Sequence, residues 1–204
     1  MTIRMSPLLG AGWLLLAMPS AQAGGFTQGS ADTDILFQDE RFAVRSGVTV
    51  VNPTRRYSRN PGNPALEGTD YAASYEIPSF AAKADLTDHL RCAGTYAKPL
   101  GGHAEYDSPK NAAHPKPVAP GIDNEGKLDE EFSIYEIGLT CAVTFGLWGG
   151  KAYVLGGAFR EDFAYDRRDI LISRGLPGVP DGTQFGDARL GFDQTQYGYR
   201  LGAA

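Results

Sequence analysis

The feature that most constrains the fold is a strict alternation of apolar and polar residues between Glu131 and Phe145. Successive side chains of a β-strand point to opposite faces, so a period of two predicts a strand with one apolar and one polar face. The apolar positions are Tyr135, Ile137, Leu139, Cys141, Val143 and Phe145, and the small or polar positions are Glu136, Gly138, Thr140, Ala142 and Thr144.

The same alternation recurs along the chain and predicts about six strands. It is clear in residues 42–50, 151–165 and 194–201, and weaker in residues 72–86 and 90–99. In residues 151–165 we expect Tyr153, Leu155, Phe159, Phe163 and Tyr165 to form the apolar face. The chain is also rich in glycine, tyrosine and phenylalanine, which favours an all-β fold.

The character of the two faces favours a membrane β-barrel over a water-soluble sheet. The apolar faces end in tyrosine and phenylalanine, and the polar faces carry Gly, Ala and Thr with an occasional charge, which suits a crowded, wet lumen. We expect the arginines on the polar faces to pair with lumen carboxylates, although one of them meeting a ligand carboxylate is the alternative. These arginines are Arg41, Arg45, Arg160 and Arg200, and the carboxylates are Glu76, Glu136 and Asp162.

The lengths of the connections support the same fold. Long connections are expected at residues 53–71, 100–130 and 166–193, and short ones at 87–89 and 147–150. Long and short therefore alternate, as in outer-membrane barrels with long outer loops and tight periplasmic turns. We expect a transmembrane antiparallel up-and-down β-barrel over residues 41–204, and a secreted β-sandwich is the alternative that patterning leaves open.

The N-terminal residues predict export. Arg4, the apolar run of residues 8–18 and the small residues up to Ala23 together resemble a signal peptide over residues 1–23. We therefore expect the chain in the cell outer membrane, with residues 24–40 as a short hatch-like segment. Six strands cannot close a barrel, and lipid does not tolerate open sheet edges, so residues 41–204 are expected to be the truncated N-terminal part of a larger barrel.

Several short motifs resemble FadL-type outer-membrane transporters. They are Asp85-Leu-Thr-Asp-His-Leu, Thr95-Tyr-Ala-Lys-Pro-Leu-Gly-Gly, Glu136-Ile-Gly-Leu-Thr and the segment from Asp193 to Ala204. The resemblance covers roughly residues 35–204 and implies a barrel of about fourteen strands with an N-terminal hatch. It also implies that long-chain fatty acids leave through a lateral opening or past the hatch. The Asn-Pro-Ala sequence common in the family's hatch occurs here only at residues 63–65, outside residues 24–40.

Passive outer-membrane transport of hydrophobic small molecules, such as long-chain fatty acids, is therefore the expected function. The expected partners are a fatty acid-like molecule and outer-membrane lipids. The alternatives are a structural or adhesive barrel and a lipid-modifying barrel enzyme. The chain lacks a Gly-x-Ser-x-Gly motif, so we do not expect an enzyme. Its 19 basic against 24 acidic residues argue against nucleic acid as a partner.

Two apolar tripeptides are the candidate ligand-binding residues. Ile170, Leu171 and Ile172 follow Asp166, which is expected to cap a short helix in the loop at 166–193. They would form a hydrophobic groove or pack against neighbouring loops. Ile35, Leu36 and Phe37 would line an inner pocket or pack within the hatch.

No cofactor and no metal site are expected. The three histidines, His89, His103 and His114, are placed in turns or loops without the spacing of metal ligands. Cys92 and Cys141 have no zinc-binding spacing either. A disulfide between them and two buried thiols both remain open.

Overall fold

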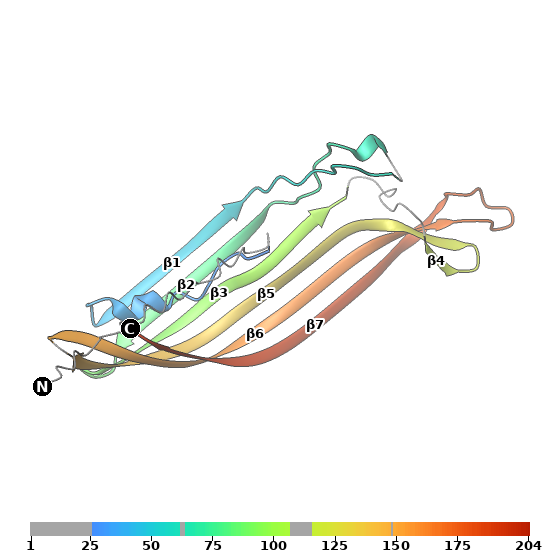
Figure 1. The fold of residues 1–204 in the computed structure, drawn as a ribbon. Helices are drawn as coiled ribbons and strands as arrows, with labels where there is room; N and C mark the ends of the chain where they lie inside the picture. Colours follow the sequence, from blue (N-terminus) through green and yellow to red (C-terminus); the bar gives the residue numbers. More distant parts are fainter. Residues whose placement is uncertain (1–25, 62–63, 107–115, 148) are drawn as a thin grey trace, which may run out of the picture.

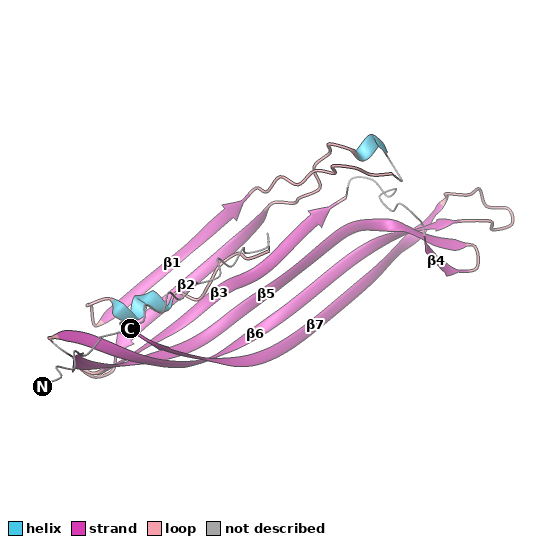
Figure 2. Ribbon diagram, viewed as in Figure 1, coloured by secondary structure: helices cyan, strands magenta, loops and turns pink. Residues whose placement is uncertain are grey.

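The computed structural model describes residues 26–61, 64–106, 116–147 and 149–204. These residues form an antiparallel sheet in the order β1-β2-β3-β5-β6-β7, with β4 paired to β5 (Figures 1 and 2). The strands are β1 (Phe42–Val51), β2 (Tyr75–Asp85), β3 (Leu90–Glu105), β4 (Lys116–Ala119), β5 (Ile122–Leu147), β6 (Gly150–Ser173) and β7 (Gln184–Ala203). Two short 3₁₀ helices are η1 (Thr33–Phe37) and η2 (Pro64–Leu66).

The prediction of an all-β, antiparallel, up-and-down sheet is confirmed. Tight turns join β2 to β3 and β5 to β6 at one end of the sheet, and the longer connections lie at the other end (Figure 1). In the first turn the hydroxyl of Thr87 accepts hydrogen bonds from the backbone N–H groups of His89 and Leu90, at 3.2 and 3.0 Å. Within the described residues the sheet is open, with β1 and β7 as its edges.

Two of the predicted loops are largely strand. β3 continues to Glu105 and β5 begins at Ile122, so much of 100–130 is paired; β6 likewise continues to Ser173 and β7 begins at Gln184. The predicted short helix after Asp166 is therefore wrong, and Ile170, Leu171 and Ile172 are strand residues of β6. Hydrogen bonding to β5 and β7 decides the structure of this segment, which has no alternation of its own.

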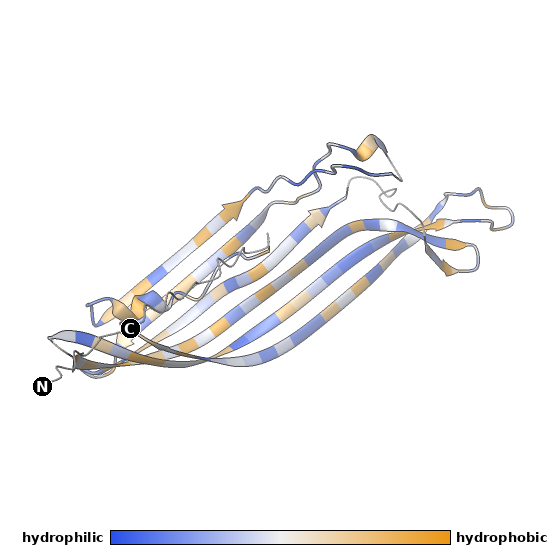
Figure 3. Cartoon of the chain, in the orientation of Figure 1, coloured by the Kyte–Doolittle hydropathy of each residue, from blue (hydrophilic) through white to orange (hydrophobic). Residues whose placement is uncertain are grey.

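The face that carries η1 is here called the inner face, and the opposite face is the outer face. On the outer face, β1, β2, β5, β6 and β7 expose large apolar side chains, here called the outer belt. Hydropathy alternates along these strands in Figure 3. This outer belt comprises Phe42, Val44, Val48, Phe80, Ile137, Leu139, Val143, Phe145, Val154, Tyr197, Tyr199 and Leu201. In β5 it spans residues 137–145.

The small core lies on the inner face under η1. Ile35 and Leu36 are fully buried against Ala81, Ala93 and Ala142, which come from three different strands. Small side chains at these positions let the helix approach the sheet closely. Burial of two large aliphatic side chains contributes roughly 1.5–3 kcal/mol each.

The predicted apolar face of β6 lies on the inner side of the sheet and not on the outer side, so this prediction is wrong. Val154 pairs with Val143, so the even residues of β6 share a face with the odd residues of β5. The aromatic and aliphatic residues at the odd positions of β6, Tyr153 and Leu155 among them, consequently lie on the inner face. A shift of one residue in a strand register reverses every side chain, and the turn between β5 and β6 sets that register.

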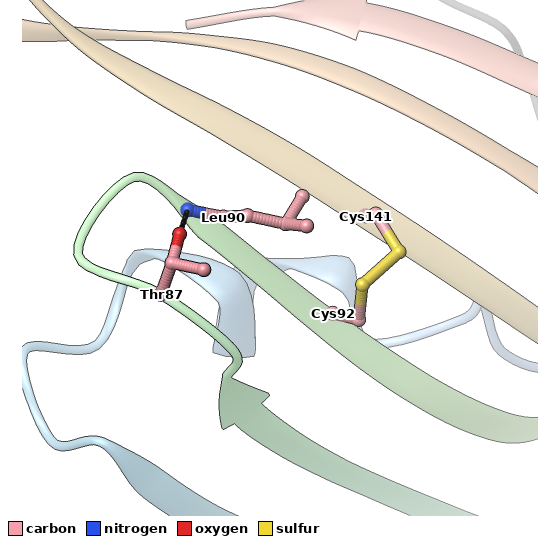
Figure 4. The surroundings of a disulfide bond; sticks show 4 residues. All are labelled: Thr87, Leu90, Cys92 and Cys141. Atoms are coloured by element: carbon pink, nitrogen blue, oxygen red, sulfur yellow. Dashed lines mark hydrogen bonds between the residues drawn. A yellow bond between two sulfur atoms is a disulfide. The ribbon is translucent and has the colours of Figure 1, made fainter.

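A disulfide joins Cys92 of β3 to Cys141 of β5 on the outer face (Figure 4). The two cysteines are direct cross-strand partners, with Cα atoms 4.0 Å apart. Of the two interpretations that the sequence leaves open, the structure has the bridge. Among the described residues, no helix is long and apolar enough to cross a membrane.

Candidate ligand-binding site

An aromatic layer lies on the inner face, in the half of the sheet nearer the long connections. Phe132, Tyr165 and Phe192 form one row across β5, β6 and β7, and Ile134 and Phe163 form the next. The rings of Phe163 and Phe192 are 5.9 Å apart. Ile134, Phe163 and Phe192, with the amides of Gln194 and Gln196, line a hollow of about 310 Å³. An apolar hollow with a few polar groups at its margin suits a hydrophobic ligand.

A polar layer lies beside this hollow, toward the tight turns. Arg200 pairs with Glu136 at 2.6 Å and stacks on Phe159, with its guanidinium carbon 4.8 Å from the ring centroid. The side chain of Gln196 donates a hydrogen bond to Glu161 at 2.6 Å. The predicted pairing of Arg200 with a carboxylate on the polar face is confirmed.

The other arginines differ from the expectation in their surroundings. Arg160 pairs with Asp162 at 2.7 Å, but the two lie on the outer face, where Arg160 stands opposite Ile137 and Tyr197. Arg45 pairs with Asp32 of the N-terminal segment at 2.5 Å. These guanidinium groups are thus already engaged by carboxylates of the chain.

The sheet has a gap between β2 and β3 that the N-terminal segment fills. β2 pairs with β3 only through residues 80–85, and β3 is bulged between Ala97 and Leu100. Residues 26–29, here called the plug, lie along this part of β3. The N–H of Gln28 donates to the carbonyl of Pro99 at 2.9 Å, and the N–H of Gly101 donates to that of Phe26 at 3.0 Å.

The plug is held weakly compared with a strand. Each of its two backbone hydrogen bonds contributes only about 1 kcal/mol. The buried side-chain amide of Gln28 has no hydrogen-bond partner among the described residues, which costs about 1–3 kcal/mol. A Cβ on Gly101 or Gly102 would come within 2.7 Å of Gln28 Nε2 or 2.9 Å of Phe26 Cδ1, so glycine at both positions admits the plug.

Two buried cations, Lys83 and Arg91, hold the C-terminal end of η1 and the residues after it. Together with Asp85 they are here called the ionic latch. Lys83 is fully buried, pairs with Asp85 at 2.9 Å and donates to the carbonyls of Gln38, at 2.8 Å, and Glu40. Arg91 donates to the carbonyl of Leu36 at 3.0 Å. Because both cations bind backbone oxygens, the latch fixes the path of the segment rather than a particular side chain.

A second hollow, of about 270 Å³, lies beyond the aromatic layer, toward the long connections. Its walls include Phe26 of the plug, Phe132, Tyr71 and Tyr106. The rings of Phe26 and Phe132 are 5.1 Å apart, and those of Tyr71 and Tyr106 stack at 5.6 Å. Arg55 lies over the ring of Phe26 at 5.0 Å. The plug therefore forms a wall of a hollow that is open to a ligand.

Two titratable groups at this hollow have shifted pKa values. Burial raises the pKa of Tyr106 to about 12, and the neighbouring Glu130 carboxylate adds to the effect. Burial also acts to raise the pKa of Glu130, but hydrogen bonds from Lys127 and Tyr165 outweigh it and leave that pKa below its usual value. The hollow thus presents a neutral phenol beside a carboxylate that stays charged.

The structure separates the two predicted tripeptides. Ile35 and Leu36 of η1 are packed against the sheet, and Phe37 makes an edge-on contact with Tyr153 at 5.1 Å, near the tight turns. Ile170 and Ile172 are buried at the other end of β6, opposite Gly126 and Asp123 of β5. Neither tripeptide lines the aromatic hollow.

The residues that line the hollow were missed from the sequence. The sequence pattern predicts Phe163 on the lipid-facing side, and it does not distinguish Ile134 and Phe192 from other strand residues. Their alternation with polar residues was the available signal, but it does not say which face is inner. Comparisons of the chain with family models, curated proteins and solved structures found no match.

Proposed function

We propose that this chain forms part of an outer-membrane β-barrel that binds hydrophobic small molecules, such as long-chain fatty acids, and passes them passively across the membrane. The observation that carries the proposal is the aromatic hollow on the inner face, formed by Ile134, Phe163 and Phe192. An inward-facing, partly exposed aromatic surface has no core to pack in, and a hydrophobic ligand fits it.

The outer belt supports a membrane location. In β5 it covers about the 9–11 residues that a tilted strand needs to cross the hydrocarbon. Tyr96 and Tyr135 stack at 6.1 Å at its upper edge, as expected of an interfacial aromatic girdle. Lipid does not tolerate unpaired sheet edges, so the proposal requires that β1 and β7 pair with further strands.

The plug suggests the route. It fills the gap between β2 and β3 and contributes Phe26 to the second hollow, so a ligand that enters this hollow contacts the segment that closes the gap. Displacement of the plug breaks two backbone hydrogen bonds and frees the amide of Gln28 to reach water. A lateral exit at this gap agrees with the resemblance to FadL-type transporters.

Uptake of a radiolabelled fatty acid by cells that express the protein tests the proposal. Phe163→Ser removes apolar contact of about 1.5–3 kcal/mol from the hollow, so uptake at low ligand concentration is expected to fall roughly tenfold or more. Ala164→Ser changes the next residue, on the outer face, and is expected to leave uptake unchanged. Both variants are compared at equal outer-membrane abundance. Equal uptake by both variants contradicts the proposed site, and a native protein without uptake favours the adhesive alternative.

A further inference from the structure

Three metal-ligating side chains converge on the outer face of β3 and β5, beyond the outer belt. His103 and Glu105 are two residues apart in β3 and therefore point to the same face. Asp129 of β5 is the direct cross-strand partner of Glu105. The sequence pattern predicts a loop at His103, whereas its position in β3 brings the three side chains together.

The distances are close to those of a bound ion. His103 Nε2 lies 3.0 Å from Asp129 Oδ2 and 3.7 Å from Glu105 Oε1, and one ligand atom of each residue lies within 4.8 Å of the others. Zinc bonds of about 2.1 Å at tetrahedral angles separate two ligand atoms by about 3.4 Å. The side chain of Glu105 is 66% exposed and free to rotate, so small adjustments reach this geometry.

We propose that His103, Glu105 and Asp129 form a binding site for a divalent transition-metal ion of the Zn²⁺ class. An imidazole with two carboxylates suits zinc and its neighbours, whereas Ca²⁺ and Mg²⁺ prefer oxygen ligands alone. The ion relieves the repulsion between the two carboxylates. Glu131 of β5 and Arg168 of β6 flank the site as cross-strand partners of His103 and Asp129, and their charges offset one another.

The position of the site gives it a structural consequence. β3 is bulged between Ala97 and Leu100, where the plug replaces β2 as its neighbour. The Cys92–Cys141 disulfide links β3 to β5 on one side of this bulge, and the proposed metal site links the same strands on the other side. The ion therefore holds β3 in place along the gap that the plug fills. The inference rests on contacts within β3 and β5 and is independent of the transported ligand.

Titration calorimetry with ZnCl₂, on the complete chain without an affinity tag in detergent micelles, tests the site. One ion per chain is expected. Residues that only orient a metal's ligands typically contribute about 10–100-fold in affinity, so loss of the ligand itself in His103→Gln is expected to weaken binding by at least about 100-fold. Glu105→Gln alters an exposed side chain that folding does not need and is expected to weaken binding at least about tenfold.

His89→Gln is the matched control, because His89 lies in the turn at the opposite end of β3. Its affinity for Zn²⁺ is expected to equal that of the native chain, and Co²⁺ absorption spectra of the two proteins are expected to coincide. Zn²⁺ is also expected to raise the melting temperature of the native chain but not that of Glu105→Gln. Absence of saturable binding, or full binding by Glu105→Gln together with loss in His89→Gln, overturns the proposal.

Discussion

Replacing Leu139 with lysine tests whether the outer belt faces lipid. Leu139 lies at the centre of the belt, is 59% exposed, and has the small residues Gly94 and Ala158 as cross-strand partners, so lysine fits without crowding. In water, a substitution at an exposed site usually changes the free energy of unfolding by less than about 0.5 kcal/mol. At the bilayer midplane, lysine on the lipid face of a barrel costs about 2–4 kcal/mol. The difference reports the medium that surrounds the side chain.

Leu190→Lys provides the matched control. Leu190 is 58% exposed but lies on the inner face of β7, opposite Arg167, so its side chain does not face the proposed lipid. Both variants are folded into phospholipid vesicles and unfolded with guanidinium chloride. Leu139→Lys is expected to lower the free energy of unfolding by about 2–4 kcal/mol, and Leu190→Lys by less than about 1 kcal/mol. Equal small effects, or cooperative folding of Leu139→Lys without lipid or detergent, refute the assignment of the belt to lipid.

Three further predictions concern the disulfide, the buried Lys83–Asp85 pair that holds the segment after η1, and Tyr106 at the second hollow. Replacing Cys92 and Cys141 with alanine is expected to lower the free energy of unfolding by about 4 kcal/mol in urea titrations, because the bridge joins residues 49 apart; an unchanged midpoint contradicts this. Lys83→Met leaves Asp85 without its closest cation and is expected to cost about 3 kcal/mol and expose η1 to hydrogen exchange, whereas unchanged protection there excludes the latch. The pKa of Tyr106 is raised to about 12, so its contribution to stability is present below about pH 10 and lost as the pH rises toward 12. Tyr106→Phe is expected to remove the last phenol to ionise from the ultraviolet titration, and identical curves contradict that assignment.

Local sequence patterns predicted only those strands and turns in which such a pattern occurs. The alternation in residues 131–145 identified the outer belt of β5, and the motif around Thr87 identified a tight turn. The segments at 122–130, 166–173 and 184–193 carry several charges, and the first and last also carry glycine, so none shows a clear period of two. They are strands because long neighbouring strands supply partners for their backbone groups. That information lies in the pairing and not in the segments themselves.

The candidate site was harder to predict than the fold because it depends on register. A period of two gives the spacing of side chains along a strand, but not the face that they occupy. One residue more or less in the turn before Gly150 would move Phe163 to the outer face and Ala164 to the inner face. The plug was also beyond local reasoning, since residues 26–29 meet β3 across about 70 residues of chain.

The apolar side of the strands changes along the sheet, and the proposed barrel accounts for this change more simply than a water-soluble sandwich does. In β5 the apolar residues lie on the outer face from Ile137 onward, but Phe132 and Ile134 lie on the inner face. β7 behaves in the same way, with Tyr199 on the outer face and Phe192 on the inner face. A water-soluble sandwich has its core on one side, so its strands keep one apolar face throughout. In the proposed barrel, a strand that crosses lipid and then borders an internal ligand site needs an apolar outer face within the membrane and an apolar inner face beyond it, and the pattern of β5 and β7 agrees with this requirement.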